Sequence, residues 1–298
     1  MDDLSVDSLL ERCNFPQENT VVDCAVSGGP DSLTLLILAV HQGLDVTAWH
    51  VDHGLREGSS AEGEKVAEAA DRLGAKSNLV TVSVIDGPNL EARARDARRE
   101  ALPKDVLTGH TADDQAETVL LNLLRGAGLP GTAGIGEPHR RPLLGIRREE
   151  TLWLCSHLGF EPIRDPMNED PRFTRSRVRH EVIPLLSEVF GRDPVPLLTR
   201  HSDHAREANE LLNDLIKDID PTDTRSLSKS PEPIVRLVIH RWLTESRQGI
   251  APESAAVERV LAVVNHEARA TDVGDGDRVE RSNGKLRFSS ASNPIKSG

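Results

Sequence analysis

Three short polar segments of the sequence combine residue types that can hold phosphate and transfer protons. The first segment is Ser27-Gly28-Gly29-Pro30-Asp31-Ser32. Its glycines allow a tight turn and a close approach of the backbone to an anion, and its serine hydroxyls can donate hydrogen bonds. A helix that begins here would direct its unpaired N–H groups at the same anion. The segment is therefore predicted to bind the phosphates of a nucleotide.

Two features limit what this loop can do by itself. It lacks the lysine of a Walker A loop, so transfer of a γ-phosphate by that machinery is not expected. Taken alone, the two glycines and the proline could form an ordinary turn, with Asp31 only complementing the dipole of the next helix. The other two segments favour a functional loop.

The second segment, residues 50–56, and the third, residues 108–118, carry histidines, carboxylates and one arginine. Their candidate residues are His50, Asp52, His53, Arg56, His110, Asp113, Asp114 and Glu117. Acidic side chains at a helix start can surround the ammonium group of an amine, and a proton acceptor is needed before that amine attacks. Asp113 and Glu117, four residues apart, should lie on one helical face.

Both segments also have structural explanations. Thr111 and Asp114 match a helix capping box, so Asp114 could serve mainly to start the helix. His50, Asp52 and His53 have spacing that could chelate zinc, but no further thiol or imidazole is positioned in the sequence to complete four ligands. The favoured interpretation is that these three residues line a substrate site or form hydrogen bonds at the end of the strand.

A fourth segment is basic. Residues 172–180 contain four arginines, one histidine and no acid, in a chain whose net charge is −12. Arg175 and Arg179 should lie one helical turn apart, with Arg177 facing elsewhere. A solvated helix face is the alternative, but such a patch can hold phosphates even on an acidic protein. Charge alone leaves the partner undecided.

Alternating strand and helix patterns must position these segments. Strands are predicted at 20–26, 44–51, 78–84 and 105–110, and helices at 31–43, 59–73, 90–102 and 112–125. Strands joined by such helices form a parallel sheet with right-handed crossovers, and ligands bind outside the carboxyl ends of the strands. The three polar segments should therefore meet along one edge of the sheet.

The rest of the chain is predicted to be mainly helical. A Gly/Pro-rich stretch covers 126–138, helices are expected at 147–159, 176–190, 194–217, 232–246 and 252–267, and a hairpin is expected around Asn283-Gly284. We expect two domains: residues 1–217, with the nucleotide loop and a helical linker, and a small, mostly helical domain at 218–298.

The composition indicates a modest apolar core. Hydrophobic residues make up 37% of the chain and charged residues 28%. The longest apolar run, 33–40, is far shorter than the ~20 residues that a membrane-spanning helix needs, and the acidic N-terminus lacks the features of a secretory signal. Three widely spaced cysteines imply neither a disulfide framework nor a metal site. We expect a cytoplasmic protein with no membrane partner.

The loop and its neighbours resemble a known family. An apolar strand followed by SGGPDS resembles the pyrophosphate loop of the ATP pyrophosphatase superfamily, whose members cleave ATP between the α and β phosphates. HVDHGLR (50–56), residues 108–135, RPLL (141–144) and residues 164–186 resemble the tRNA(Ile)-lysidine synthetases over about residues 20–190. Members of that family activate the wobble cytidine of an isoleucine tRNA with ATP, and lysine then displaces AMP.

The resemblance implies a fold, cofactors and residue roles. The fold would be α/β, with a parallel five-stranded Rossmann-like sheet of the adenine nucleotide α-hydrolase type. The protein would be a carbon–nitrogen ligase that uses ATP and Mg²⁺ on tRNA(Ile) and lysine, with its second domain contacting the tRNA. Residues 27–32 would bind ATP and Asp31 would hold Mg²⁺. The implied catalytic residues are Asp31, His110, Asp113, Asp114 and Arg177, and the implied substrate or RNA contacts are His50, Asp52, His53, Arg56, Glu117, Arg175 and Arg179.

Two other functions stay open. A tRNA thiolase of the same superfamily would need paired Cys-x-x-Cys motifs or a catalytic cysteine, and only Cys155, within an apolar helix, is available in the later part. A non-catalytic nucleotide-binding protein would need neither the acidic cluster nor the arginine segment. A homodimer is possible, since the second domain could also supply a packing or dimer surface.

Overall fold

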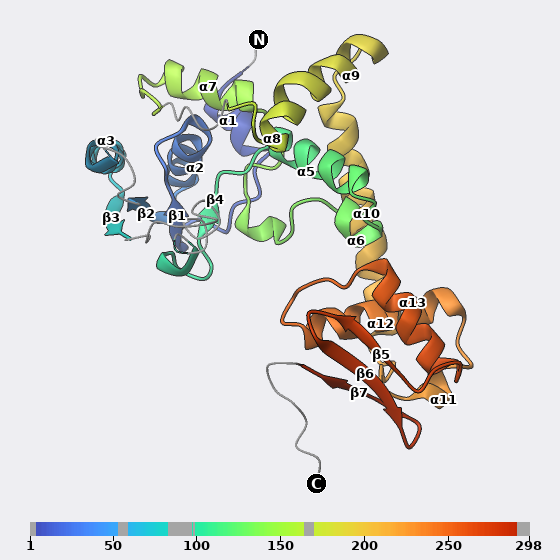
Figure 1. Ribbon diagram of the computed structural model, residues 1–298. Coiled ribbons are helices and arrows are strands. Elements are labelled where there is room, and N and C mark those ends of the chain that lie inside the picture. Colours follow the sequence, from blue (N-terminus) through green and yellow to red (C-terminus); the bar gives the residue numbers. More distant parts are fainter. Residues whose placement is uncertain (1–3, 53–58, 83–96, 98, 164–169, 291–298) are drawn as a thin grey trace. The chain divides into compact units, whose positions relative to one another are not determined.

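The computed structural model describes residues 4–52, 59–82, 97, 99–163 and 170–290 (Figure 1). The chain divides into two compact units, Met1–Glu207 and Ala208–Gly298. The division falls within α10 (Val195–Ile216), the longest helix among the described residues. Among the residues that the structure describes, no helix is both long and apolar enough to cross a membrane.

A parallel sheet forms the centre of the first unit. Its strands are β1 (Val21–Ala25), β2 (Asp45–Asp52), β3 (Lys76–Thr81) and β4 (Leu107–Thr108), in the spatial order β3-β2-β1-β4. Cys24 of β1 pairs with Ala48 of β2 on one side and with Leu107 of β4 on the other. A central strand covered on both faces is largely apolar, and the one polar residue of β1, Asp23, accepts from Trp49 Nε1 of β2 at 2.7 Å.

The expectation of five parallel strands is wrong for the residues that the structure describes, which contain four. After α5 (Ala112–Leu124) the chain enters its glycine- and proline-rich stretch and forms only short turns, α6 (Leu129–Thr132) and η1 (Pro138–Arg140). Proline cannot donate to a strand ladder and glycine weakens one, so this stretch does not extend the sheet. The helix expected at 90–102 lies largely outside the described residues.

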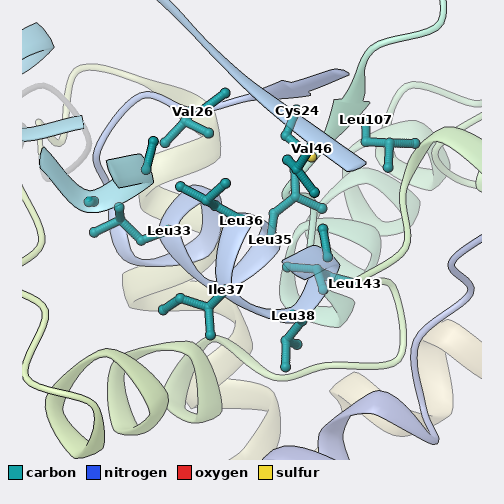
Figure 2. Close-up of a cluster of buried hydrophobic side chains, with 14 of the residues drawn as sticks. Cys24, Val26, Leu33, Leu35, Leu36, Ile37, Leu38, Val46, Leu107 and Leu143 are labelled. Carbon is teal, nitrogen blue, oxygen red and sulfur yellow. The ribbon is translucent and has the colours of Figure 1, made fainter. Parts of the chain in front are cut away.

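Helices cover the sheet and build the core. The further helices of this unit include α1 (Val6–Leu10), α2 (Pro30–His41), α3 (Ser59–Arg72) and α7 (Arg148–His157). Figure 2 shows that the labelled apolar side chains of α2 point outward from the helix in several directions. Leu35, Leu36, Ile37 and Leu38 are fully buried, so α2 is covered on nearly every side. A helix buried in this way keeps its first turn, and the loop before it, in a fixed position.

The basic segment belongs to a continuous helical run with a local widening. It comprises α8 (Thr174–Arg177), a π-helical turn η3 (Val178–Val182) and α9 (Ile183–Phe190). Pro184 gives a physical reason for the widening, because it lacks an N–H and its ring would clash with the carbonyl of His180 in a regular α-helix.

The second unit packs helices against a small antiparallel sheet. Its elements are α11 (Thr224–Leu227), α12 (Glu232–Ser246), α13 (Ser254–Val264), β5 (Ala270–Gly274), β6 (Asp277–Ser282) and β7 (Lys285–Ser289). The hairpin predicted around Asn283-Gly284 is confirmed, and both residues have positive φ. The expectation of a mostly helical domain missed β5, which pairs with β6 to complete a three-stranded sheet.

Candidate active site

The predicted phosphate loop joins β1 to α2. Gly28 has φ +86°, a conformation that favours glycine, and a Cβ atom there would lie 2.3 Å from Cδ1 of Ile163, so that side chain would have to shift. Ser32 Oγ donates to the Gly29 carbonyl at 2.9 Å and accepts from the Ser27 N–H at 3.1 Å. The loop is therefore a closed turn at the start of a buried helix, as the sequence predicts.

The other two polar segments reach the same edge of the sheet. Gly109 follows β4, and a Cβ atom at Gly109 would lie 2.6 Å from the carbonyl oxygen of Asp31, so the two backbones are in direct contact. His50 of β2 is buried, and its Nδ1 lies 2.9 Å from the carbonyl oxygen of Val26. The convergence of the strand ends is confirmed.

Four candidate residues of these two segments lie outside the contact between the two backbones or outside the described residues: His110, Asp52, His53 and Arg56. His110 Nδ1 lies 2.9 Å from Thr108 Oγ1, at the end of β4. Asp52 is the last residue of β2 and is partly exposed. His53 and Arg56 lie outside the described residues.

A cluster of carboxylates and guanidinium groups, buried at Asp114 and Glu117 and partly exposed elsewhere, lies beside the loop. Its members are Asp31, Asp114, Glu117, Arg148, Arg175 and Arg179. The Glu117 carboxylate is fully buried: its Oε1 accepts from Arg179 Nε at 2.7 Å and from Arg148 Nη1 at 3.1 Å. Its Oε2 accepts from Arg175 Nε at 2.8 Å and from Arg179 Nη2 at 3.1 Å. Three arginines thus satisfy one carboxylate, as burial of a charge requires.

Asp114 shares all three of these arginines, with Arg179 Nη2 3.5 Å from its Oδ1, and also starts α5. Its Oδ1 accepts from Arg148 Nη2 at 2.8 Å and from Arg175 Nη2 at 3.1 Å. Its Oδ2 accepts from the Thr111 N–H at 2.9 Å, which is the predicted capping box. Burial opposes ionisation of Asp114, but Arg148 and Arg175 outweigh it and lower the pKa of this carboxyl. The structural and the functional interpretations of Asp114 are therefore both compatible with its contacts.

Asp31 is the member of the cluster that belongs to the phosphate loop. Its Oδ1 accepts from Thr151 Oγ1 at 2.6 Å, and its Oδ2 lies 3.5 Å from Arg148 Nε. Burial raises the pKa of Asp31, against the opposing effects of Arg148 and Thr151. Arg148 is thus in contact with carboxylates from both the loop and α5.

Asp113 and Arg177 point to other partners. Asp113 accepts from Arg147 Nε at 3.1 Å and from the Arg148 backbone N–H at 2.8 Å, so it fastens α5 to the start of α7. Although Asp113 and Glu117 lie one turn apart, their side chains pair with different guanidinium groups. Arg177 is 61% exposed and pairs with Glu181 at 2.8 Å. The structure therefore brings Arg175 and Arg179 into the cluster, but not Arg177.

Sequence reasoning gave no role to three residues at the start of α7: Arg147, Arg148 and Thr151. Arg147 and Arg148 sit at the N-terminal end of a helix, where the macrodipole disfavours positive charge. Two consecutive cations at such a position require carboxylates from elsewhere in the fold. The two consecutive arginines at the start of a predicted helix are visible in the sequence, and they could have suggested a contact with the acidic cluster.

A solved structure has the same fold. The U34-tRNA thiolase NcsA from Methanococcus maripaludis, with its [4Fe-4S] cluster, matches with a TM-score of 0.52 over 72% of this chain and 80% of that chain. The sequence identity of the pair is 17%, so the likeness shows the fold alone.

Sequence comparisons identify the family. A family model described as a PP-loop domain matches residues 4–186. The tRNA(Ile)-lysidine synthase of Rhodococcus erythropolis is 41% identical over 246 residues, 77% of this chain and 75% of that protein. The enzymes of the same name from Nocardia farcinica and Mycolicibacterium paratuberculosis are 41% and 43% identical, over 78% and 74% of this chain and 78% and 73% of their own lengths. The chain therefore belongs to the PP-loop proteins, which use ATP, and among them to the tRNA(Ile)-lysidine synthase family.

Proposed function

We propose that this protein ligates lysine to C2 of the wobble cytidine of tRNA(Ile) with the CAU anticodon. The cytidine O2 attacks the α-phosphorus of ATP and pyrophosphate leaves. The ε-amine of lysine then attacks C2, and the C2–O2 bond breaks as AMP leaves with that oxygen. One observation carries the proposal: the phosphate loop and a buried carboxylate pair meet at a single side chain, Arg148. A phosphate site next to an amine site is what this reaction needs.

The loop is proposed to bind the phosphates of ATP. Gly28 and Gly29 let the backbone approach the anion, and Ser27, Ser32 and the first turn of α2 supply donors. Asp31 is proposed to hold Mg²⁺. Among the described residues no group of three or more His, Cys, Asp and Glu side chains is arranged to hold a metal ion. A single carboxylate fits Mg²⁺, which proteins commonly bind through one or two carboxylates together with substrate phosphates. The ion would neutralise phosphate charge.

Asp114 and Glu117 are proposed to receive the ammonium group of lysine. In the described structure both carboxylates are already paired with guanidinium groups, so lysine must replace at least one of them. Arg175 and Arg179 are the groups proposed to move, because phosphate oxygens of ATP or RNA compete for a guanidinium group as strongly as carboxylates do. Binding of the nucleotide would therefore prepare the site for the amine.

The remaining candidate residues fit this scheme. His110 lies between β4 and the start of α5, and in its neutral form it is our candidate for taking a proton from the amine. Arg177 is exposed and so is available to RNA rather than to the cluster. His50 and Asp52 are proposed to line the substrate side of the sheet edge, and His53 and Arg56 stay predictions from the sequence.

The second domain, residues 218–298, is proposed to contact the tRNA. Along β6 and β7, Val279 and Leu286 are buried, whereas Arg278, Lys285 and Arg287 are exposed. The outward face also carries Glu280 opposite Arg287, and Lys285 pairs with Asp220, so the face is basic by excess. A strand pair with one apolar face and one mainly basic face can rest on the core and meet phosphates at the same time. A homodimer and a cytoplasmic location also stay proposals; sedimentation at several protein concentrations tests the first.

The thiolase alternative is less well supported by the cysteines. Burial raises the pKa of Cys13 and Cys24 to about 12 and that of Cys155 to about 11. A thiol with such a pKa is almost wholly protonated at neutral pH, and the thiolate is the nucleophile. An amine from outside the protein is the better candidate for the incoming group.

The test is incubation of the protein with ATP, Mg²⁺, isotopically labelled lysine and a tRNA(Ile) transcript with the CAU anticodon. We expect pyrophosphate release that depends on the transcript, and labelled lysine on its wobble nucleoside by mass spectrometry. The control is the same transcript with uridine at the wobble position, which should take up no lysine. Incorporation of sulfur, or no dependence on lysine, would overturn the proposal.

A further inference from the structure

We propose that Arg148 is a positioning residue, which holds Asp31 of the phosphate loop at a fixed distance from Asp114 and Glu117 of α5. The inference rests on the proposed function, in which the nucleotide lies at the loop and lysine at the carboxylates. Arg148 would then set the spacing between the two substrates. It would act through the carboxylates it holds.

The contacts of Arg148 use every nitrogen of its side chain. Nε lies 3.5 Å from Asp31 Oδ2, Nη2 lies 2.8 Å from Asp114 Oδ1, and Nη1 lies 3.1 Å from Glu117 Oε1. The three carboxylates come from the start of α2 and from α5, and the arginine comes from α7. One planar group therefore ties three helices together at the candidate site.

The chemistry of the guanidinium group explains why this position carries arginine. A guanidinium group presents its donors in a rigid planar fork, whereas a lysine ammonium is a single point charge on a flexible stem. A lysine ammonium also has three donors, but they radiate from one nitrogen on a flexible stem, whereas the fork places donors on three nitrogens in fixed directions. Asp31 and Asp114 are also close enough to repel each other, so a cation between them is needed to keep both near one site.

The surroundings of Arg148 fix its own position. Its backbone N–H donates to Asp113 Oδ2 at 2.8 Å, and its carbonyl oxygen lies 2.8 Å from Thr151 Oγ1. The apolar side of α7 is held separately, since Leu154 and Cys155 are fully buried in the core that includes α2. Because that packing does not involve Arg148, stability and substrate positioning should respond differently to its replacement.

The experiment compares Arg148→Lys and Arg148→Gln with Arg12→Gln. Arg12 pairs with Glu150 through two bonds of 2.6 and 3.1 Å, so its replacement removes another ion pair of α7 but leaves the cluster intact. Three quantities are measured for each full-length variant: the melting temperature, the affinity for α,β-methylene ATP with Mg²⁺ by calorimetry, and kcat and KM for lysine with the tRNA transcript.

We expect both Arg148 variants to lose about 100-fold in kcat/KM for lysine and to bind the nucleotide analogue at least about tenfold more weakly. Arg12→Gln should match the wild type in both. The proposal is overturned if Arg148→Lys behaves as wild type, because charge without the fork would then suffice. It is also overturned if the Arg148 variants show lower melting temperatures but unchanged affinity and kinetics.

Two further experimental outcomes also decide the proposal. If Arg148→Gln does not fold, Arg148→Lys, which keeps the charge, decides the question by the same criteria. If the wild type binds the nucleotide but transfers no lysine, the proposed function fails while the positioning role is judged on nucleotide affinity alone. Weaker binding by Arg148→Lys than by Arg12→Gln would then support it, and equal binding would overturn it.

Discussion

The backbone of Gly109 packs directly against the backbone of Asp31, so closely that a Cβ atom at Gly109 would lie 2.6 Å from the Asp31 carbonyl oxygen. Gly109 follows β4, and Asp31 belongs to the first turn of α2. The contact sets the distance between the phosphate loop and the segment that leads through His110 into α5. The two halves of the candidate site are therefore held together by main chain as well as by the charged cluster.

Replacement of Gly109 by alanine should separate these two segments. The new methyl group would meet backbone atoms, which cannot rotate away, so we expect a loss of about 1–3 kcal/mol in stability and a larger loss of ATP-dependent activity. The control is Gly136→Ala, where a Cβ atom would meet nothing within 4 Å. Thermal melts and pyrophosphate release measure the two effects. Normal activity of Gly109→Ala would show that the spacing is not critical.

Thr151 should matter through its hydroxyl and not through its shape. Its Oγ1 donates to Asp31 Oδ1 at 2.6 Å in a fully buried position. Thr151→Val keeps the volume but leaves the carboxylate short of a donor, so we expect pyrophosphate release to fall about tenfold or more. Thr151→Ser retains the hydroxyl and should stay near the wild-type rate. Equal rates for the valine and serine variants would contradict this role.

The pH dependence of stability should report on Asp114. Its pKa is lowered in the folded state, so it stabilises the fold above its unfolded-state pKa, and that contribution is lost as the pH falls through the folded-state value. Asp114→Asn should therefore be less stable than the wild type at neutral pH, and the gap should narrow below about pH 4. Thermal melts between neutral and acidic pH measure the gap. A difference that does not change with pH would exclude this contribution.

The cysteines should be dispensable for the chemistry. Cys155 is buried, its Sγ lies 3.7 Å from the Pro30 carbonyl oxygen, and burial raises its pKa to about 11. We expect Cys155→Ala to keep lysine transfer within about threefold of the wild type, since a small buried thiol mainly fills space. A loss of activity with an unchanged melting temperature would instead favour a thiolase-like role for this residue.

Glu117 and Arg177 should affect different substrates. Glu117→Gln removes the fully buried charge of the cluster and should raise KM for lysine. Arg177→Gln changes an exposed side chain paired with Glu181, and should weaken tRNA binding and reduce its salt dependence by about one unit of slope. Kinetics at varied lysine and tRNA binding at several salt concentrations separate the two. An effect of Arg177→Gln on KM for lysine would place it at the amine site instead.

Much of the fold was predictable because its signals are local. Apolar runs and the glycines that end helices predicted β1, β2, α2, α3 and α5 within a few residues, and the Asn283-Gly284 turn predicted the hairpin. Parallel strands then required the polar segments to meet at one edge. The number of strands was not predictable in this way: the five-stranded expectation came from the resemblance and not from local patterns, and the residues that the structure describes contain four parallel strands.

The sequence by itself determined the phosphate loop, the acidic start of α5 and the shared face of Arg175 and Arg179, since each depends on residues within one or two helical turns. The tertiary structure alone decided which guanidinium group meets which carboxylate. Arg148 joins Asp31 to Asp114 and Glu117, while Asp113 pairs with Arg147. Those pairings join residues far apart in the chain, and they depend on how α2, α5 and α7 pack. Helical periodicity carries no information about such distances.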